Sequence, residues 1–160
     1  MRGPLIAVIG GSSATDEEAK LAEEVGRALG RAGAVLVCGG RTGVMEAACR
    51  GAREAGGLTV GILPGSDPGE ANPFVDIPVV TGIGYARNAI VTQTAQAVIA
   101  IAGSFGTLSE IGFALGYDKP LVGLRTWVVA REGHPSVPII RADTAEEAVE
   151  QALALAQTGS

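Results

Sequence analysis

Two charged residues stand beside glycines in a pattern that suits chemistry on a phosphorylated ligand. Glu110 ends the stretch "AGSFGTLSE" at 102–110, and Arg87 lies within "YARNAIV" at 85–91. An arginine holds a phosphate through two parallel hydrogen bonds, or steadies a neighbouring carboxylate. A carboxylate beside a ligand stabilises positive charge that develops in a transition state. Arg87 and Glu110 are therefore the candidate catalytic residues.

Each of these residues also has a purely structural interpretation. The spacing Thr107-Leu-Ser-Glu110 fits a capping box, in which Glu110 accepts a hydrogen bond from the backbone N–H of Thr107. The alternative for Arg87 is a surface salt bridge. The surrounding glycines favour the functional interpretation, because a capping glutamate does not require an open turn.

Three glycine-rich turns follow apolar runs and predict an anion site. They are "IGGSS" at 9–13, "CGGRTG" at 38–43 and "AGSFGT" at 102–107. Glycine lets backbone approach a ligand closely, and the start of a helix presents unpaired N–H groups to an anion. A tight turn explains any one of the three equally well. The candidate ligand-binding and phosphate-binding residues are Gly10, Gly11, Ser12, Gly39, Gly40, Thr42, Gly43, Asn88, Gly103, Ser104, Gly106 and Thr107.

The elements that must position these residues alternate along the chain. Strands are expected at 5–9, 34–38, 59–63, 76–80, 97–101 and 121–124, with weaker ones near 127–130 and 138–140. Helices are expected from a capping box of Thr15 and Glu18 to residue 32, and at 42–55, 86–95, 108–117 and 144–156. This order predicts one Rossmann-like α/β domain over 1–160, a doubly wound parallel sheet with strand order 3-2-1-4-5-6. Ligands bind such sheets at the carboxyl ends of the strands.

Other well-known sites find little support in the sequence. There is no P-loop motif and no G-x-G-x-x-G, which argues against an NTPase or an NAD dehydrogenase. "GGSSA" loosely matches a nucleophile elbow, so a serine hydrolase with Ser12 as nucleophile and His134 as base is a minor alternative. No Cys/His cluster indicates a metal site, and Cys38 is expected to be a core thiol.

Composition bounds the partners and the compartment. The chain has 160 residues, is 47% hydrophobic and 18% charged, and carries a net charge of −5. No basic stripe suggests nucleic acid, and no apolar run is long enough for a membrane helix. We expect a cytoplasmic protein with neither nucleic-acid nor membrane partners. The long connection at 64–74 is either a lid over the site or a mobile surface loop.

Three motifs together resemble a known family. "GGRTGVMEAACRGA" at 39–52, "YARNAIV" and "GSFGTLSE" are similar to motifs of the Lonely Guy group of Rossmann-like proteins. The chain resembles most its short branch, which includes the molybdenum cofactor carrier proteins. The resemblance covers about residues 5 to 125. Enzymatic members of the group release a free base from a nucleoside 5′-monophosphate, without a cofactor.

The resemblance extends to individual site residues. The pattern of the enzymes is P-G-G-x-G-T-x-x-E with an Arg-Lys pair on the preceding helix, and Gly106, Thr107, Glu110 and Arg87 match it. Ala102-Gly103-Ser104 replaces the P-G-G, and Asn88 stands in place of the lysine.

Two functions are therefore expected, a nucleoside monophosphate hydrolase or a non-catalytic carrier of a phosphorylated nucleotide or pterin-type cofactor. Homodimers or larger assemblies are implied, with "IGFALGY" at 111–117 as a candidate contact.

Overall fold

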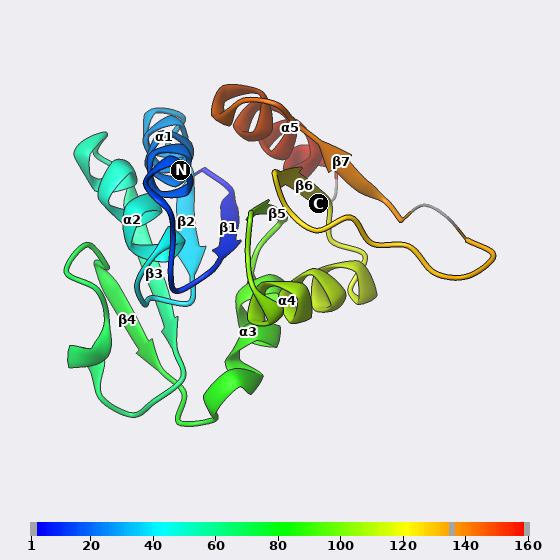
Figure 1. The fold of residues 1–160 in the computed structure, drawn as a ribbon. Helices are drawn as coiled ribbons and strands as arrows, with labels where there is room; N and C mark the ends of the chain where they lie inside the picture. The colour runs from blue at the N-terminus through cyan, green and yellow to red at the C-terminus, as the bar shows by residue number, and fades with distance from the viewer. Residues whose placement is uncertain (1–2, 135–136, 159–160) are drawn as a thin grey trace.

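The structure is a computed structural model that describes residues 3–134 and 137–158 of the chain. Its centre is a seven-stranded sheet in the order β4-β3-β2-β1-β5-β6-β7, with every neighbouring pair parallel (Figure 1). The strands are β1 (Leu5–Gly10), β2 (Val35–Cys38), β3 (Leu58–Leu63), β4 (Ile77–Val80), β5 (Ala97–Ile101), β6 (Leu121–Leu124) and β7 (Ile139–Arg141). The predicted fold class, a Rossmann-like α/β domain, is confirmed.

Helices cover the sheet in two layers. The helices are α1 (Asp16–Arg31), α2 (Val44–Glu54), α3 (Arg87–Thr94), α4 (Phe105–Gly116) and α5 (Ala145–Thr158). One layer holds α1, α2 and α5 and the other holds α3 and α4, each with its own buried apolar cluster (Figure 1). The two layers explain why β1, β2, β5 and β6 are apolar throughout, since strands buried on both faces lack polar alternation.

The predicted strand order is wrong in one place. The segment at 76–80 was expected beside β1, but β4 pairs with β3 at the edge of the sheet, with Gly61 opposite Pro78. Proline donates no backbone hydrogen bond and therefore suits an edge strand. The connection between β3 and β4 contains only a 3₁₀ turn, η1 (Pro68–Glu70), and is otherwise the irregular segment expected at 64–74.

The remaining differences are local. The Thr15–Glu18 capping box is confirmed. The strand expected at 138–140 forms as β7, whereas 127–130 is irregular. The loop at 64–74 is tied to the turn after β2, because Asn72 donates from its backbone N to Gly40 O at 2.9 Å and from Nδ2 to Arg41 O at 2.7 Å. In the described part of the chain, no helix has the length and apolar character needed to cross a membrane.

The topology fixes where a ligand site belongs. From β1 the chain winds outward through β2 and β3 to β4, then returns through α3 to β5 on the other side of β1. The winding therefore reverses between β1 and β5, and the turns at their carboxyl ends face the same crevice. This crevice is the usual ligand site of an open α/β sheet.

Candidate functional site

A cavity of about 410 Å³ occupies this crevice, within the size range of small-molecule sites. Its lining comes from the end of β1, the starts of α2 and α3, and the first two turns of α4 with the residue before them. The lining residues are Gly10, Ser12, Met45, Tyr85, Arg87, Asn88, Ser104, Phe105, Gly106, Thr107, Ser109 and Glu110. The two predicted catalytic residues thus share one cavity, as do six of the predicted ligand-binding residues.

Arg87 is the first residue of α3, and its exposed fraction is only 7%. Its Nε donates to Ile62 O at 2.9 Å and its Nη2 to Gly39 O at 3.3 Å, while Nη1 donates to Asn88 Oδ1. A Cβ on Gly39 would lie 2.7 Å from Nη2, so glycine is what makes room for the guanidinium. None of the ion pairs among the described residues involves Arg87, and the surface ion-pair interpretation is wrong.

Glu110 is the sixth residue of α4 and is also only 7% exposed. Burial raises the pKa of its carboxyl to about 8, and the nearby charge of Arg87 opposes that shift. Burial likewise lowers the pKa of Arg87, against the charge of Glu110. Among the described residues, no hydrogen bond reaches the Glu110 carboxyl. Because Glu110 lines the cavity, its carboxyl oxygens can accept or donate a hydrogen bond to a ligand there.

The capping interpretation of Glu110 is wrong. The helix begins at Phe105, three residues earlier than predicted, and Ser104 is its N-cap. Thr107 accepts a hydrogen bond from the backbone N of Ser104 at 3.3 Å, so the capping contact lies one turn before Glu110. The position of Glu110 inside the helix therefore has no capping function.

Asn88 links the arginine to the glutamate helix. It is 3% exposed, accepts from Arg87 and donates from Nδ2 to Ser109 Oγ at 3.2 Å. Ser109 Oγ in turn donates to Gly106 O at 2.6 Å. The residue in place of the family lysine thus joins α3 to α4 and adds no charge to the cavity.

The glycines of the turns after β1 and β2 serve mainly close packing. A Cβ on Gly43, whose φ is 66°, would lie 2.3 Å from Gly11 O, and one on Gly10 would lie 2.4 Å from Val44. Gly40 has a φ of 75° and lies against Gly61. The tight-turn alternative therefore accounts for these glycines without a ligand.

The turn after β5 has a different character. Ala102 has a φ of 47°, a conformation that is uncommon for a residue with a side chain and tends to occur at functional sites. Gly103 has a φ of 117° and packs on the Thr107 side chain. A Cβ on Gly106 would meet nothing within 4 Å, so this glycine opens onto the cavity.

Two further cavities adjoin the first. One of about 470 Å³ contains Arg41, Thr42 and Glu70 and shares Ser12, Met45, Tyr85 and Arg87 with it. The other, of about 270 Å³, contains Gly11, Ser12, Gly103 and Ser104. The Thr42 hydroxyl donates to Ser12 O at 2.8 Å, which joins the first two turns.

Sequence reasoning missed four residues that line the first cavity, which are Met45, Tyr85, Phe105 and Ser109. It also missed four that line the adjoining cavity of about 470 Å³, which are Arg41, Pro64, Glu70 and Gly84. Tyr85 and Phe105 stood inside the quoted motifs, and an aromatic residue among glycines was a signal that was not used.

The minor alternatives fare differently. No hydrogen bond among the described residues joins Ser12 to His134, and His134 is exposed in a turn with Arg131, away from the cavity lining. Cys38 is a buried core thiol, as predicted. The structure adds that its Sγ lies 3.5 Å from Sγ of Cys49, with both cysteines free. No group of three or more potential metal ligands occurs in residues 3–134 and 137–158.

The fold and the crevice define a Rossmann-like protein with a small-molecule site at the β1–β5 switch point. The chain belongs to the SLOG cluster4 family, whose model matches residues 4–151.

Relatives and solved structures agree with this assignment. The chain is 34% identical over 142 residues to the cytokinin riboside 5′-monophosphate phosphoribohydrolase of Mycobacterium tuberculosis, covering 77% of this chain and 76% of the relative. It resembles the molybdenum cofactor binding protein of Rippkaea orientalis with a TM-score of 0.84 and 36% identity, over 94% of this chain and 96% of that one. The molybdenum cofactor carrier protein of Chlamydomonas reinhardtii matches with a TM-score of 0.83 and 34% identity, over 96% and 98%.

Proposed function

We propose that this protein binds a phosphorylated nucleotide or nucleotide-like cofactor at the carboxyl edge of the sheet. The observation that carries the proposal is that a buried basic residue, Arg87, and a buried acidic residue, Glu110, line one cavity. Ionisable side chains are rarely buried without a reason, and perturbed pKa values cluster at functional sites. The names of the similar proteins support the same ligand class, because one acts on a riboside 5′-monophosphate and the others bind or carry molybdenum cofactor.

The residues suggest how the ligand is held. The first turn of α4 presents backbone N–H groups at Phe105 and Gly106 that have no partner within the helix, and these suit phosphate oxygens. Arg87 supplies a positive charge that burial leaves poorly screened by water. A Glu110 carboxyl with a pKa of about 8 is largely protonated at neutral pH, so it neither repels the phosphate nor cancels the arginine.

Turnover is a second step of the proposal. Hydrolysis of the N-glycosidic bond would release the free base and ribose 5-phosphate, with an ionised Glu110 stabilising the developing positive charge on the ribose. The free carboxyl oxygens of Glu110 at the cavity favour this step. The non-catalytic carrier is the alternative, favoured by the protonated state of Glu110 at neutral pH and by Asn88 in place of a lysine.

Two measurements test these steps in order. Calorimetry against a panel of nucleoside 5′-monophosphates and phosphorylated pterins tests binding, with the dephosphorylated compounds as matched controls. Binding of a phosphorylated compound that is lost with its phosphate is the expected result, and heat from none of the panel contradicts the proposal. Chromatography of the free base released between about pH 5 and pH 9 then tests turnover across the range in which Glu110 ionises. A protein that binds without releasing base is a carrier.

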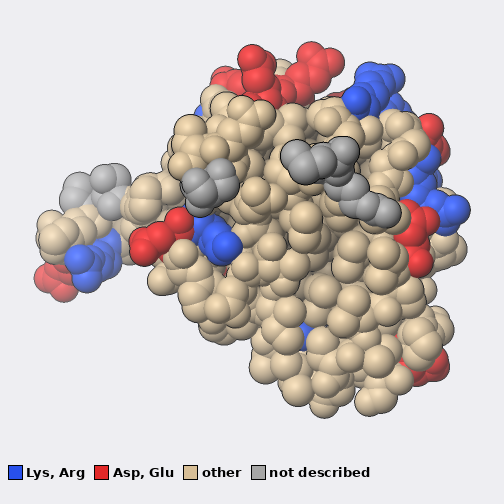
Figure 2. All heavy atoms as spheres, turned by 180° about the vertical axis from the view of Figure 1, so that it is seen from behind, with Lys and Arg blue, Asp and Glu red and all other residues tan. Residues whose placement is uncertain are grey.

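We also propose that the protein self-associates through the layer of α3 and α4. Residues 77–117 contain no charged residue other than Arg87 and Glu110, and both are buried. Figure 2 shows few charged side chains over the lower part of the molecule, where this layer lies. An uncharged face can meet its own copy without opposing like charges.

The test of self-association is the Gly112→Glu variant. A side chain at Gly112 meets nothing within 4 Å in one copy, so the new charge disturbs only a contact with another molecule. Light scattering should show an assembly for the parent and a smaller species for the variant. A parent that is monomeric contradicts this part of the proposal.

The free thiols of Cys38 and Cys49 also suit a reducing compartment, and we propose a cytoplasmic location.

A further inference from the structure

Two large aromatic side chains line the Arg87–Glu110 cavity with most of their surface uncovered. Tyr85 is 83% exposed and Phe105 is 80% exposed. Side chains of this size are normally covered, because exposed aromatic surface is unfavourable in water. Their uncovered faces border the space in which the proposed ligand would lie.

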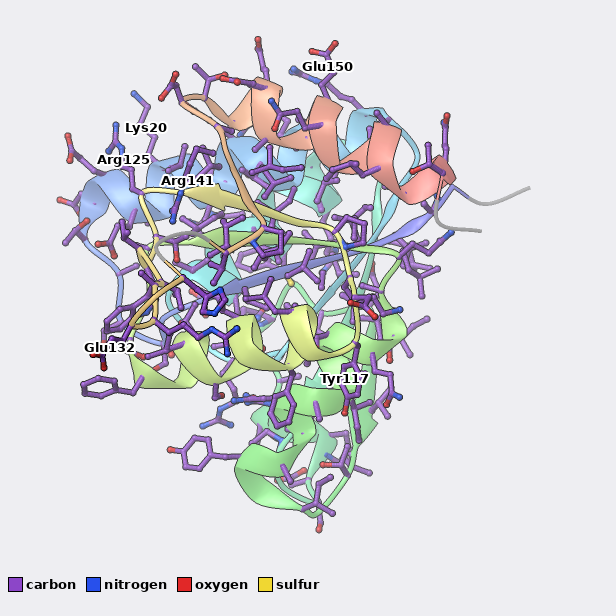
Figure 3. The ribbon with its side chains drawn as sticks, turned by 90° about the vertical axis from the view of Figure 1, so that its right-hand side faces the viewer. Lys20, Tyr117, Arg125, Glu132, Arg141 and Glu150 are labelled. Atoms are coloured by element: carbon purple, nitrogen blue, oxygen red, sulfur yellow. The ribbon has the colours of Figure 1, made fainter. Side chains whose placement is uncertain are left out.

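Phe105 is held in place before any ligand arrives. Its ring stacks on Trp127 with a centroid distance of 5.8 Å and an interplanar angle of 28°. Trp127 Nε1 donates to Ser104 O at 3.1 Å, which ties the tryptophan to the same turn. Arg141 of β7, labelled in Figure 3, donates from Nη2 to Trp127 O at 2.7 Å. A group that is already fixed loses little conformational entropy when it contacts a ligand.

Tyr85 reaches the cavity from a separate element. It lies in the 3₁₀ turn η2 (Gly84–Ala86), directly before Arg87 at the start of α3. It also lines the adjoining cavity that contains Arg41, so it stands where the two cavities meet. The aromatic surface therefore comes from the starts of both helices that supply the charged groups, with Tyr85 in the turn before α3 and Phe105 at the first position of α4.

We propose that Phe105, backed by Trp127, is the stacking surface for a planar heteroaromatic ring of the ligand, and that Tyr85 is a second aromatic contact. This inference rests on the proposed function and narrows its ligand class. The ligand is a phosphorylated compound that carries such a ring, and a sugar phosphate without a ring fills only part of the site. Stacking uses the face of the ring, so it selects for planarity more than for a particular base.

Trp127 supplies a direct readout because it is the only tryptophan in the chain. The ring-bearing probe is whichever of adenosine 5′-monophosphate, guanosine 5′-monophosphate or a phosphorylated pterin binds most tightly by calorimetry. Ribose 5-phosphate is the probe without a ring. The ring-bearing probe should change the emission of Trp127 through the stacked Phe105, and ribose 5-phosphate should leave it unchanged.

Substitutions then separate the ring from the phosphate. Phe105→Ala should weaken the ring-bearing probe about tenfold to a hundredfold, the range of base–aromatic stacking, and leave ribose 5-phosphate unaffected. Phe105→Leu keeps apolar bulk without the aromatic face and should fall between parent and alanine. Tyr85→Ala should act in the same direction. Val128→Ala is the control, because Val128 is 84% exposed, adjoins Trp127 and is absent from the cavity lining.

The outcomes distinguish this inference from the proposed function. If neither probe binds, the proposed function fails and the stacking surface with it. If both bind equally well, or if Phe105→Ala and Phe105→Leu match the parent, only the stacking surface is overturned. Light scattering on each variant tests whether these aromatic residues form a protein interface instead. A variant that changes the assembly but keeps its affinity for the ring-bearing probe would also overturn the inference.

Discussion

The two helix layers treat charge in opposite ways. On the layer of α1 and α2, charged side chains are partly exposed and paired with one another, as in Arg27–Glu23 at 3.0 Å and Arg50–Glu23 at 3.4 Å. Figure 3 shows Lys20 and Glu150 directed outward from α1 and α5. On the other layer, residues 111–117 contain no charged residue, and Tyr117 at their end is labelled in the same view. The layer of α3 and α4 keeps its two charged residues, Arg87 and Glu110, inside.

This contrast shows what each set of charges does. Exposed pairs contribute little to stability and chiefly keep a surface soluble. A buried arginine and a buried glutamate are costly to keep, and here they border a cavity. The chain therefore has its site on the layer whose surface carries few charges.

The largest expected effect is the loss of ligand binding in Gly106→Val. A Cβ at Gly106 meets nothing within 4 Å of its own chain, so the added bulk enters the cavity without straining the helix. Calorimetry should detect no binding, while circular dichroism and the melting temperature stay close to those of the parent apart from a small helix-propensity term. Gly112→Val is the control for added bulk in α4, because Gly112 also meets nothing within 4 Å and is absent from the cavity lining. Light scattering of both variants separates a loss of binding from a change in assembly. A Gly106→Val protein that binds like the parent would make this glycine a turn residue only.

The next effect is a pH dependence of stability that arises from Glu110. Its pKa is raised from 4.5 to about 8 in the folded protein. Below the unfolded value both states hold the proton, and between these two pKa values only the folded state does. The free energy of unfolding therefore falls as pH rises through this window, by up to about 1.4 kcal/mol per pH unit, and the loss is complete above the folded pKa.

Glu110→Gln removes this titration and keeps the shape of the side chain. In urea unfolding at several values from pH 5 to pH 9, the variant should gain stability relative to the parent as the pH rises. A difference between the two proteins that stays constant over this range would mean that the carboxyl is not held protonated by burial.

A third effect separates hydrolase from carrier through the same residue. If the protein turns over its ligand, the rate in the parent should rise as the pH passes about 8, because the ionised Glu110 is the form that stabilises the transition state. Glu110→Gln should lower the rate by about 100-fold or more and remove the rise, with little change in ligand affinity. Base release measured by chromatography checks this. Equal rates in parent and variant would exclude Glu110 from the chemistry.

Much of this arrangement could be predicted from the sequence, and the exceptions have physical causes. Periodicity finds buried strands well, because strands covered on both faces are apolar throughout. Periodicity does not say where a short strand pairs. Pro78 indicated an edge strand, but the expected order placed this segment beside β1, whereas β4 pairs with β3 at the edge of the sheet. The motifs singled out Arg87 and Glu110, and the structure places both residues in one cavity. The motifs did not show that the helix starts at Phe105, and this shift alone decides whether Glu110 is a cap or a cavity residue.

Glycines were the least decisive signal. The same residue type serves close packing at Gly43 and an open cavity at Gly106, and only the neighbours of each position tell them apart. Sequence cannot list those neighbours, because they come from other elements. The predicted roles of the individual ligand-binding residues stay predictions until a ligand is bound.

The smallest effect is expected on the other layer, in Glu23→Gln. Glu23 accepts hydrogen bonds from Arg27 at 3.0 Å and Arg50 at 3.4 Å and so links α1 to α2, but all three side chains are partly exposed. Exposed pairs of this kind contribute about 0.2–1 kcal/mol each, and salt screens them. The variant should lose no more than about 1 kcal/mol of unfolding free energy at low ionic strength and less in about 1 M salt, with ligand binding unchanged. The pH-dependent difference caused by Glu110→Gln should survive the same salt, because burial shields that carboxyl from counterions. Urea unfolding of both variants at low and high salt makes the comparison, and a Glu23→Gln loss that is large and insensitive to salt would contradict the contrast between the two layers.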